Sequence, residues 1–523
     1  MNTGIGNFDL IVVGIYFFCI LLIGLYVARS TKTSEDLFLG GRSFGWGLIG
    51  LSLFASNIST STIIGLSGAA YSSGIVQSVY EWMTGIPLII AALIFIPLYL
   101  NSRITTIPEF LELRYDYRSR KFFSIITIFT SIVVDTAGGL YAGAIVLKAF
   151  FPDLIIWQTT LLLALVAGIY TAFGGLKAVV YTDAIQAVVL IIGCSTLSYF
   201  MFEQLDFSWT KVVQNAPQDF LSIVRPLDDS SLPWPGLICA VPVLGFWYWT
   251  TNQYIVQRIL GARDVNNARW GVILASFLKI IPLFIMVIPG TMAIGLFPGL
   301  ENPDQVFPTA VINILPAGLI GLVLAGLISA IMSSVDSTLN SASTLFVIDF
   351  IKTAKPNISE VDILKYGRYT TLCLMILAAV WAPMIENFGG IWSYLQQMFS
   401  IIVPPIAVIF LVGVFYKRGN KEGAFWTLIC GTLLGLLIFI LGQIGLWSLH
   451  YTYNVGIMTL VSSILFVLIS KYTSPPNMSR IQEFSYRKEL ITQSTQGLSW
   501  YANYIVQIVL LLFSIGLILI LFW

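Results

Sequence analysis

The sequence predicts an all-α protein that crosses a lipid bilayer many times, and three observations lead to this prediction. Hydrophobic residues make up 57% of the 523 residues, and charged residues make up 10%. An ordinary soluble domain carries about 25% charged residues, whereas this chain has a mean hydropathy of +0.86. Apolar runs of spanning length recur to the end of the chain, and the loops between them alternate in charge. The net charge of +1 gives no reason to expect nucleic acid as a partner.

The first apolar run, residues 8–29, is expected to be a retained membrane helix. Its stretch from Leu10 to Ala28 is long enough to span a hydrocarbon core of about 30 Å. Asp9 precedes it without any Lys or Arg, and no Ala-x-Ala cleavage site follows it. A secretory signal peptide has the opposite features, so we expect the N-terminus to lie outside the cell.

The later runs predict about fourteen helices in all. These begin near residues 8, 46, 76, 122, 155, 180, 235, 270, 316, 367, 390, 423, 453 and 501. Every second loop is basic, as with Arg103, Arg114 and Arg118 after the third helix. Cytoplasmic loops carry this excess of Lys and Arg, so the alternation predicts a multi-pass inner-membrane protein with both termini outside. The longest outer segment, residues 203–234, has room for a short helix or a lid.

The cysteine and histidine content argues against an enzyme. None of the five cysteines forms a Cys-x-x-Cys pair, and His450 is the single histidine. We interpret the cysteines as small buried apolar residues. A membrane-embedded enzyme or a sensor would need a nucleophile motif, a metal motif or a signalling domain, and the sequence has none of these.

Five ionisable residues fall inside the predicted spans, where a charge costs about 2.5–3.5 kcal/mol on insertion scales. They are Glu81, Asp135, Asp183, Lys279 and Asp336. Tyr80, Glu81 and Thr84 share one helix face because they are three and four residues apart. We expect Glu81 to pair with Lys279, directly or through a hydroxyl-rich solute. A structural pair that holds two helices together is the alternative.

Residues 55–62 interrupt an apolar span with six polar side chains, in the order Ala-Ser-Asn-Ile-Ser-Thr-Ser-Thr. Serine, threonine and asparagine compete for backbone hydrogen bonds and weaken helix interiors. A broken helix at membrane depth is tolerated where it is buried in protein or lines a cavity, and its freed carbonyls can coordinate a cation. A Ser/Thr-rich packing face is the alternative.

A second polar cluster occupies the span that begins near residue 316. Ser333 and Ser334 follow Ala330 by three and four residues, so the two hydroxyls and the Ala330 carbonyl can reach one point beside the helix. Uncharged oxygen ligands suit a small monovalent cation. The two serines are a weak signal alone, and they gain weight from the predicted break at residues 55–62.

Aromatic and amide side chains complete the pattern. Tyr248 and Trp249 lie in an aromatic run within an apolar span, and Trp392 and Gln396 are four residues apart on one helix face. Ring faces that stack, together with amides and an acid–base pair that bond hydroxyls, are typical of sugar recognition. An interfacial aromatic belt is the alternative.

These residues make the chain resemble the sodium/solute symporters, and within them the sodium/glucose cotransporter branch that includes the bacterial sodium/galactose symporter. The resemblance covers nearly the whole chain. The segments that carry it are Ser56–Ser59, Tyr80–Met83, Thr106–Phe110, Gly174–Asp183, Asn252–Arg258 and Ser333–Ser341. It implies the leucine-transporter-type fold, in which two inverted repeats of five helices surround a midplane site.

The same resemblance divides the single transporter domain, residues 1–523, into five parts. They are an extra N-terminal helix (8–29), a first repeat (46–202), an outer loop (203–234), a second repeat (235–414) and additional C-terminal helices (415–523).

The resemblance also implies a sodium-coupled symporter that imports a sugar or sugar-like polyol by alternating access. Sodium would be held by the carbonyls of Ala55, Ile58 and Ala330 and the hydroxyls of Ser333 and Ser334. The solute would contact Asn57, Glu81, Thr84, Lys279 and Gln396. Tyr248 would stack on the solute as the inner gate, supported by Trp249, and Tyr80 and Trp392 would close the outer side.

Three positions depart from the sodium/galactose symporter, one of them mildly, since Thr84 replaces a serine. Thr62 stands where that protein has glutamine, and Gly245 where it has asparagine. The changes at Thr62 and Gly245 each remove an amide that could hydrogen-bond the solute. Sites that bind hydroxyl groups discriminate strongly between solutes through such hydrogen bonds, so the resemblance does not imply galactose itself. A non-sugar solute such as myo-inositol, a sialic acid or an amino acid is the alternative.

A second sodium is expected from a further part of the resemblance. Asp183 and Ser337 match positions that bind a second ion in some relatives, and Asp336 is adjacent. The expected ligands of this second ion are Asp183, Ser333, Asp336 and Ser337.

Overall fold

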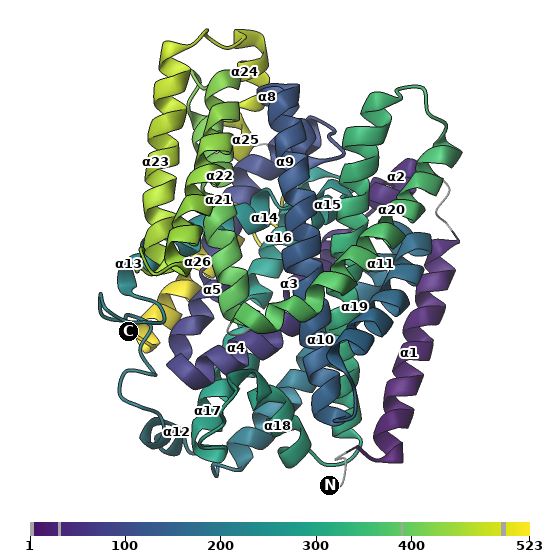
Figure 1. The fold of residues 1–523 in the computed structure, drawn as a ribbon, viewed down its shortest axis with the longest axis vertical. Helices are drawn as coiled ribbons and strands as arrows, with labels where there is room; N and C mark the ends of the chain where they lie inside the picture. Colours follow the sequence, from purple (N-terminus) through teal and green to yellow (C-terminus); the bar gives the residue numbers. More distant parts are fainter. Residues whose placement is uncertain (1–4, 30–32, 389–390, 493–497) are drawn as a thin grey trace.

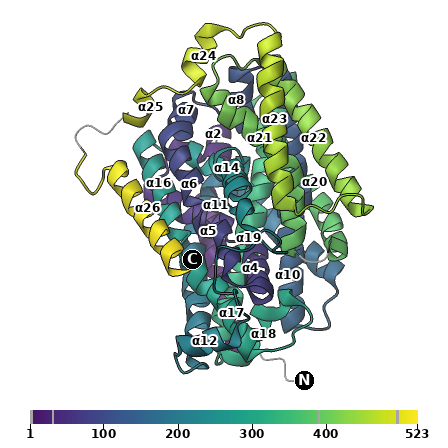
Figure 2. The same ribbon diagram turned by 90° about the vertical axis from the view of Figure 1, so that its left-hand side faces the viewer.

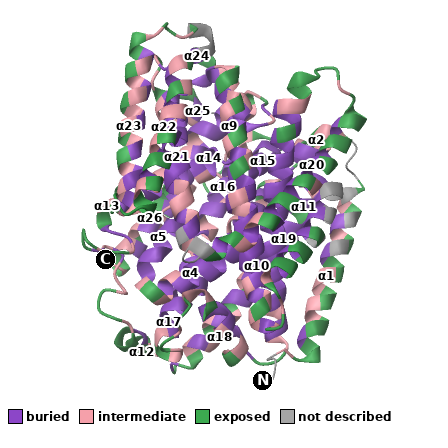
Figure 3. Ribbon diagram, in the orientation of Figure 1, coloured by how far each residue is buried: buried purple, intermediate pink, exposed green. Residues whose placement is uncertain are grey.

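The computed structural model describes residues 1–523 except 1–4, 30–32, 389–390 and 493–497. The described chain is built almost wholly from helices, most of which run along the long axis of the molecule (Figures 1 and 2). Buried residues fill the interior, and exposed ones gather on the outward faces of peripheral helices such as α1 (Asn7–Ala28) and α23 (Tyr451–Tyr472) (Figure 3). The exposed faces of α1 and α23 carry large apolar side chains such as Ile15, Phe18 and Leu460, as expected of a helix bundle whose solvent is partly lipid.

The first half of the chain contains twelve α-helices among the described residues. They are α1, α2 (Ser34–Leu39), α3 (Trp46–Asn57), α4 (Thr60–Ser73), α5 (Val79–Trp82), α6 (Gly85–Ile90), α7 (Ile96–Asn101), α8 (Ile107–Arg114), α9 (Tyr117–Thr130), α10 (Ala137–Phe150), α11 (Ile156–Glu203) and α12 (Trp209–Asn215). Short 3-10 segments, η1 (Gly40–Arg42) and η2 (Ile75–Ser78), link some of them.

The second half contains fourteen more in the part of the chain that the structure describes. They are α13 (Trp234–Cys239), α14 (Val241–Thr250), α15 (Gln253–Leu260), α16 (Val265–Leu278), α17 (Ile288–Leu296), α18 (Val306–Ile314), α19 (Leu319–Leu345), α20 (Glu360–Trp381), α21 (Ile391–Phe415), α22 (Lys421–Gln443), α23, α24 (Met478–Phe484), α25 (Glu489–Thr492) and α26 (Tyr504–Leu521). Two further 3-10 segments are η6 (Pro303–Gln305) and η8 (Ala382–Phe388).

The multi-pass architecture is confirmed, whereas the number fourteen stays a prediction. Eleven described helical stretches are long and apolar enough to cross a membrane, and the bent pair α3–α4 makes twelve. The spans predicted to begin near residues 155 and 235 are the other two. The first lies in α11, which runs through a non-helical Gly175 with φ 64°. The second is divided into the short helices α13, α14 and α15.

Side-chain caps explain where several helices begin. Asp116 accepts a hydrogen bond from the Ser119 amide at the start of α9, and Asp264 accepts one from the Asn267 amide at the start of α16. Each cap satisfies an amide that has no partner within the helix. Both helices therefore start at polar loops and then turn apolar as they enter the bundle.

Four spans contain a short π-helical segment among the described residues. These are η3 (Ala91–Phe95), η4 (Ser131–Thr136), η5 (Leu283–Val287) and η7 (Phe346–Lys352). Such segments are frequent at functional sites because they rotate the side chains that follow. Here η4 contains Asp135, one of the predicted intramembrane charges.

The most buried of the described membrane spans contains α19, which packs against α11, α1, α20 and α10. Its polar residues therefore face protein on every side. Away from this centre, the basic loops meet at one end of the molecule: Arg42 donates to the carbonyls of Leu260 and Ile104, and Arg118 pairs with Glu422 at 2.6 Å.

Candidate functional site

The predicted helix break is confirmed. Helix α3 ends at Asn57 and α4 begins at Thr60, with a bend of 58° between them. Ile58 leaves helical geometry with ψ 75°, and the side chain of Ser59 caps α4 by accepting from the Thr62 amide. The polar run therefore supplies a cap in mid-membrane, where an apolar sequence would have continued the helix.

The break diverts two amides from their helical partners. The Ser59 amide, which would reach the Ala55 carbonyl in an unbroken helix, donates to Asn57 at 3.0 Å. The Thr62 amide, which would reach the Ile58 carbonyl, donates to the Ser59 hydroxyl at 3.1 Å. The carbonyls of Ala55 and Ile58 are therefore deprived of these bonds, and they are two of the predicted sodium ligands.

Helix α19 brings the predicted serine pair to this break. Ser333 and Ser334 are 0% and 5% exposed, so neither faces lipid. Ser334 donates to the Ala330 carbonyl at 2.9 Å, which places these two predicted ligands side by side. Thr60 of α4 donates to the Leu327 carbonyl of α19 at 2.9 Å and ties the two elements together. A hydroxyl that donates one hydrogen bond keeps lone pairs for a cation.

A cavity of about 120 Å³ lies beside the break. It is lined by most of the predicted solute-contacting residues, namely Asn57, Thr62, Tyr80, Glu81, Thr84, Gly245, Tyr248, Trp249, Trp392 and Gln396. Of the five predicted sodium ligands, Ser334 lines it, whereas Ala55, Ile58, Ala330 and Ser333 are not among its lining residues. The walls come from α3, α4, α5, α14, α15, α19 and α21, from the π segment η4, and from Ser59 and Thr84 between helices.

The predicted acid–base pair forms beside the cavity, where Glu81 is a lining residue and Lys279 lies behind it. Lys279, at the C-terminal end of α16, donates to the carboxylate of Glu81 and to the side-chain oxygen of Asn57. Lys279 is fully buried and Glu81 is 3% exposed. A buried charge pair of this kind needs full hydrogen bonding to offset its desolvation, and Asn57 supplies the additional acceptor.

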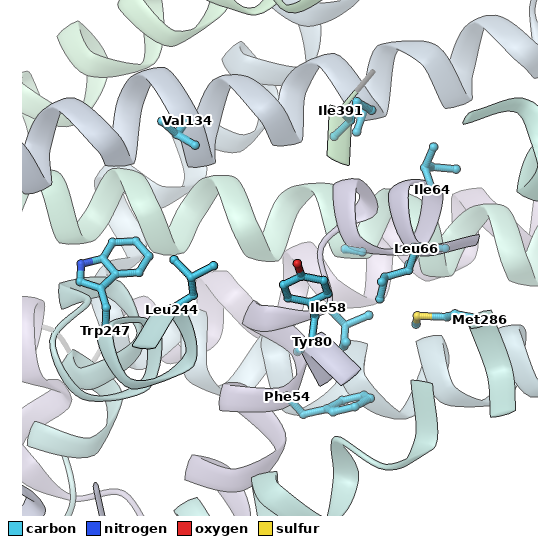
Figure 4. Close-up of a cluster of buried hydrophobic side chains, with 14 of the residues drawn as sticks. Phe54, Ile58, Ile64, Leu66, Tyr80, Val134, Leu244, Trp247, Met286 and Ile391 are labelled. Atoms are coloured by element: carbon cyan, nitrogen blue, oxygen red, sulfur yellow. The ribbon is translucent and has the colours of Figure 1, made fainter. Parts of the chain in front are cut away.

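Aromatic rings close the cavity. On one side the hydroxyl of Tyr254 donates to Tyr248 at 2.6 Å, and Tyr248 packs edge-on against Trp249. On another side Tyr80 meets Trp392 edge-to-face, with ring centroids 5.4 Å apart. Tyr80 belongs to the same buried cluster as Ile58, Leu244 and Trp247 (Figure 4).

The departures Thr62 and Gly245, like Thr84, line the cavity. Thr62 donates its hydroxyl to the Asn57 carbonyl at 3.0 Å, so it serves the helix break rather than projecting an amide into the cavity. A Cβ added at Gly245 would lie 3.1 Å from Pro87 and 3.4 Å from Thr84. Glycine therefore lets α14 approach α6 closely.

Several cavity residues were not singled out as solute contacts from the sequence. They are Ser61, Asp135, Trp247, Tyr254, Thr338, Leu395 and Phe399, among others. Asp135 is recognisable in the sequence as an ionisable residue inside a predicted span. Its Oδ2 is buried with no hydrogen-bond partner among the described residues. The sequence does not distinguish Leu395 and Phe399 as cavity residues, because they are apolar residues within an apolar span.

The structure gives Asp183 a cationic partner that the sequence did not reveal. Arg258 of α15 pairs with Asp183 of α11 at 3.1 Å, and both side chains are 0% exposed. Asp183 also accepts from Ser52 at 2.6 Å, Ser56 at 3.0 Å and Ser333 at 2.5 Å.

This network bears on the second sodium. An ionised carboxylate offers about four lone-pair positions. Three donors converge on Oδ2 of Asp183, and Ser333 donates to Oδ1. Ser337 accepts from Arg258, and Asp336 is buried one helical turn after Ser333. The second sodium stays a prediction.

The fold and the site together define a membrane transporter: a multi-pass bundle with a broken helix at a buried cavity that is lined by polar groups. The sodium:solute symporter family model matches residues 37–431. Human sodium/myo-inositol cotransporter 2 is 33% identical over 550 residues, covering 95% of this chain and 81% of the relative. Rabbit (Oryctolagus cuniculus) sodium/glucose cotransporter 1 is 32% identical over 524 residues, covering 89% and 79%.

Solved structures share the fold. A sodium-coupled sialic acid symporter in a substrate-bound, outward-open state superimposes with a TM-score of 0.81 at 23% identity, covering 90% of this chain and 99% of that one. Mhp1, a nucleobase-cation-symport-1 family transporter, gives 0.56 at 14% identity over 86% and 98%. The chain belongs to the sodium:solute symporter family. It is therefore a transporter that uses sodium as its coupling ion rather than an enzyme.

Proposed function

We propose that this protein imports a sugar or sugar-like polyol together with sodium. The observation that carries the proposal is the Glu81–Lys279–Asn57 cluster at a cavity that is walled by Tyr248, Trp249 and Trp392. A hydroxyl group can donate to the carboxylate and accept from the ammonium at once. A ring that carries many hydroxyls is thus the class of solute that this pair recognises best.

The charge at the cavity argues against the other solute classes. A simple carboxylate solute would prefer a positive group or a helix N-terminus without a facing acid, and here Glu81 stands beside Lys279. The named solutes of the two relatives, myo-inositol and glucose, are both polyhydroxylated rings. They agree with the chemistry of the cavity, and they leave the choice between a sugar and a cyclic polyol to experiment.

Coupling follows from the position of the proposed ion site. Its ligands would be the carbonyls of Ala55, Ile58 and Ala330 and the hydroxyls of Ser333 and Ser334. A sodium held there joins the break between α3 and α4 to α19, so it favours the arrangement in which both helices meet. One sodium that moves inward through 100 mV releases about 2.3 kcal/mol. A tenfold sodium gradient adds about 1.4 kcal/mol.

The two-repeat architecture has support in the order of irregular helices. In the first proposed repeat, residues 46–202, the broken helix α3–α4 precedes a span with a π segment, η3. In the second, residues 235–414, the interrupted helices α14 and α15 precede a span with the π segment η5. Corresponding breaks in two halves are typical of inverted-repeat transporters.

The proposed orientation places the protein in the cell's inner membrane with both termini outside. The contacts among basic loops support this, since Arg42, Arg118 and their partners lie at one end and are thus cytoplasmic by the excess of positive charge. The C-terminal end contacts the proposed outer loop, where the Ile223 amide donates to Phe522 at 2.8 Å.

Counterflow in proteoliposomes tests the solute class. Vesicles that contain the purified protein and unlabelled solute are given a labelled panel of glucose, galactose, myo-inositol, a sialic acid and proline, with and without sodium. We expect sodium-dependent exchange of a neutral polyhydroxylated ring and none in the Glu81→Gln variant. Exchange of the sialic acid or proline alone would contradict the proposal.

A further inference from the structure

The hydroxyl of Tyr80 has a partner outside the two proposed repeats. Tyr80 lies on α5 in the first repeat, and Tyr451 is the first residue of α23 among the C-terminal helices. Their phenol oxygens are 2.5 Å apart, within a hydrogen bond. Tyr80 is 9% exposed and Tyr451 is half-buried, so this bond is partly shielded from solvent.

Two contacts fix the ring of Tyr80. The Trp392 ring meets it edge-on at 5.4 Å, and Tyr451 holds its hydroxyl tip. Tyr80 and Trp392 both line the solute cavity, whereas Tyr451 lines a separate polar cavity between α21, α22 and α23. Tyr451 therefore acts on the solute site only through Tyr80.

The start of α23 is itself held firmly. The His450 side chain caps the helix by accepting from the Thr452 amide, and its ring lies 4.3 Å from that of Tyr451. Tyr453 donates to the Leu227 carbonyl of the outer loop at 2.8 Å. Gly236 of α13 approaches so closely that an added Cβ would lie 2.8 Å from Thr452. Tyr451 is thus presented from a fixed support.

We propose that Tyr451 is a positioning residue for the outer gate, through which the accessory helix α23 takes part in closing the solute cavity. The inference rests on the proposed function, in which Tyr80 and Trp392 close the outer side. Closure with Tyr80 in place makes the bond to Tyr451, and moving Tyr80 away to open the cavity breaks it. Tyr451 therefore favours the closed, solute-holding arrangement and has no direct contact with the ion site.

Phenylalanine variants test this with little risk to folding. We compare Tyr451→Phe, Tyr80→Phe and the double variant with Tyr453→Phe, which removes a hydroxyl from the same helix that bonds the outer loop instead. Initial uptake rates in proteoliposomes give the solute KM, the maximal rate and the sodium concentration for half-maximal activation at saturating solute. Any panel solute that the wild type exchanges serves as the probe.

We expect Tyr451→Phe to raise the solute KM by about two- to tenfold, the worth of one neutral hydrogen bond. Tyr80→Phe should give the same rise, the double variant no further rise, and Tyr453→Phe none, with sodium activation unchanged throughout. A wild-type KM in Tyr451→Phe, or multiplied effects in the double variant, would overturn the inference. Failure of the proposed solute class shows separately, as exchange of a different panel solute by the wild type.

Discussion

Neutralising the Glu81–Lys279 pair in steps separates its role in stability from its role in solute binding. The three variants are Glu81→Gln, Lys279→Met and both together. In the wild type, Lys279 donates to Glu81 and to Asn57 at 0% exposure. Lys279→Met thus leaves a carboxylate 3% exposed without its cation, whereas Glu81→Gln leaves the ammonium with two neutral oxygen acceptors.

The magnitudes follow from burial. Removing one partner of a buried pair costs about 3–5 kcal/mol, because the other charge stays desolvated and unpaired. Replacing both partners with well-packed hydrophobic side chains of similar volume is often neutral or stabilising by about 1–4 kcal/mol, and the double variant approaches this case because neither new side chain carries a charge. We therefore expect Lys279→Met to be the least stable variant, Glu81→Gln to be intermediate, and the double variant to recover most of the wild-type stability.

Thermal unfolding of the purified protein in detergent reports stability, and sodium-driven uptake in proteoliposomes reports function. The double variant should be folded and stable yet unable to transport, because both groups that bond the solute hydroxyls are gone. Lys211→Met is the matched control, since Lys211 and Asp206 form an exposed ion pair in the proposed outer loop and its loss should change neither readout. Near-normal uptake by the double variant would show that the pair is structural and would remove it from the solute site.

Three further substitutions probe the ion sites and the outer surface. Ser334→Ala should raise the sodium concentration for half-maximal uptake by about tenfold or more, which is the effect of losing a hydrogen-bonding group that contacts a charge. The solute KM at saturating sodium should stay nearly unchanged. An equal loss of sodium and solute affinity would argue against a dedicated ion site. Asp183→Asn should destabilise the protein, because Arg258 loses its carboxylate, without changing the sodium-to-solute ratio measured by dual-label flux; a lower ratio would restore the second sodium. Burial lowers the pKa of His450 from 6.5, against the effect of nearby Asp229, so the unfolded chain binds more protons in mild acid and stability falls as pH drops below about 6.5. His450→Gln should remove that part of the fall in Tm, and an unchanged pH profile would contradict it.

The sequence by itself determined that the chain folds in a lipid bilayer, that a helix is broken within residues 55–62 and that Glu81 pairs with Lys279. A chain with few charges must hide its backbone polar groups in helices, so the bundle follows from composition. The run from Ser56 to Thr62 predicts a break because each polar side chain offers the backbone a competing partner, and Ser59 takes that role as the cap of α4. Glu81 and Lys279 were predicted to pair because a lone charge at that depth is costly.

Tertiary structure alone decided which residues from distant helices meet. Arg258 reaches Asp183 across 75 residues of sequence, and Tyr451 reaches Tyr80 across 371. Neither pair could be predicted from local pattern, because helices that are apolar on every side carry little periodicity to show which face meets which neighbour. For the same reason the packing of α21 against α4 and α14, and not the local sequence, places Leu395 and Phe399 at the wall of the cavity.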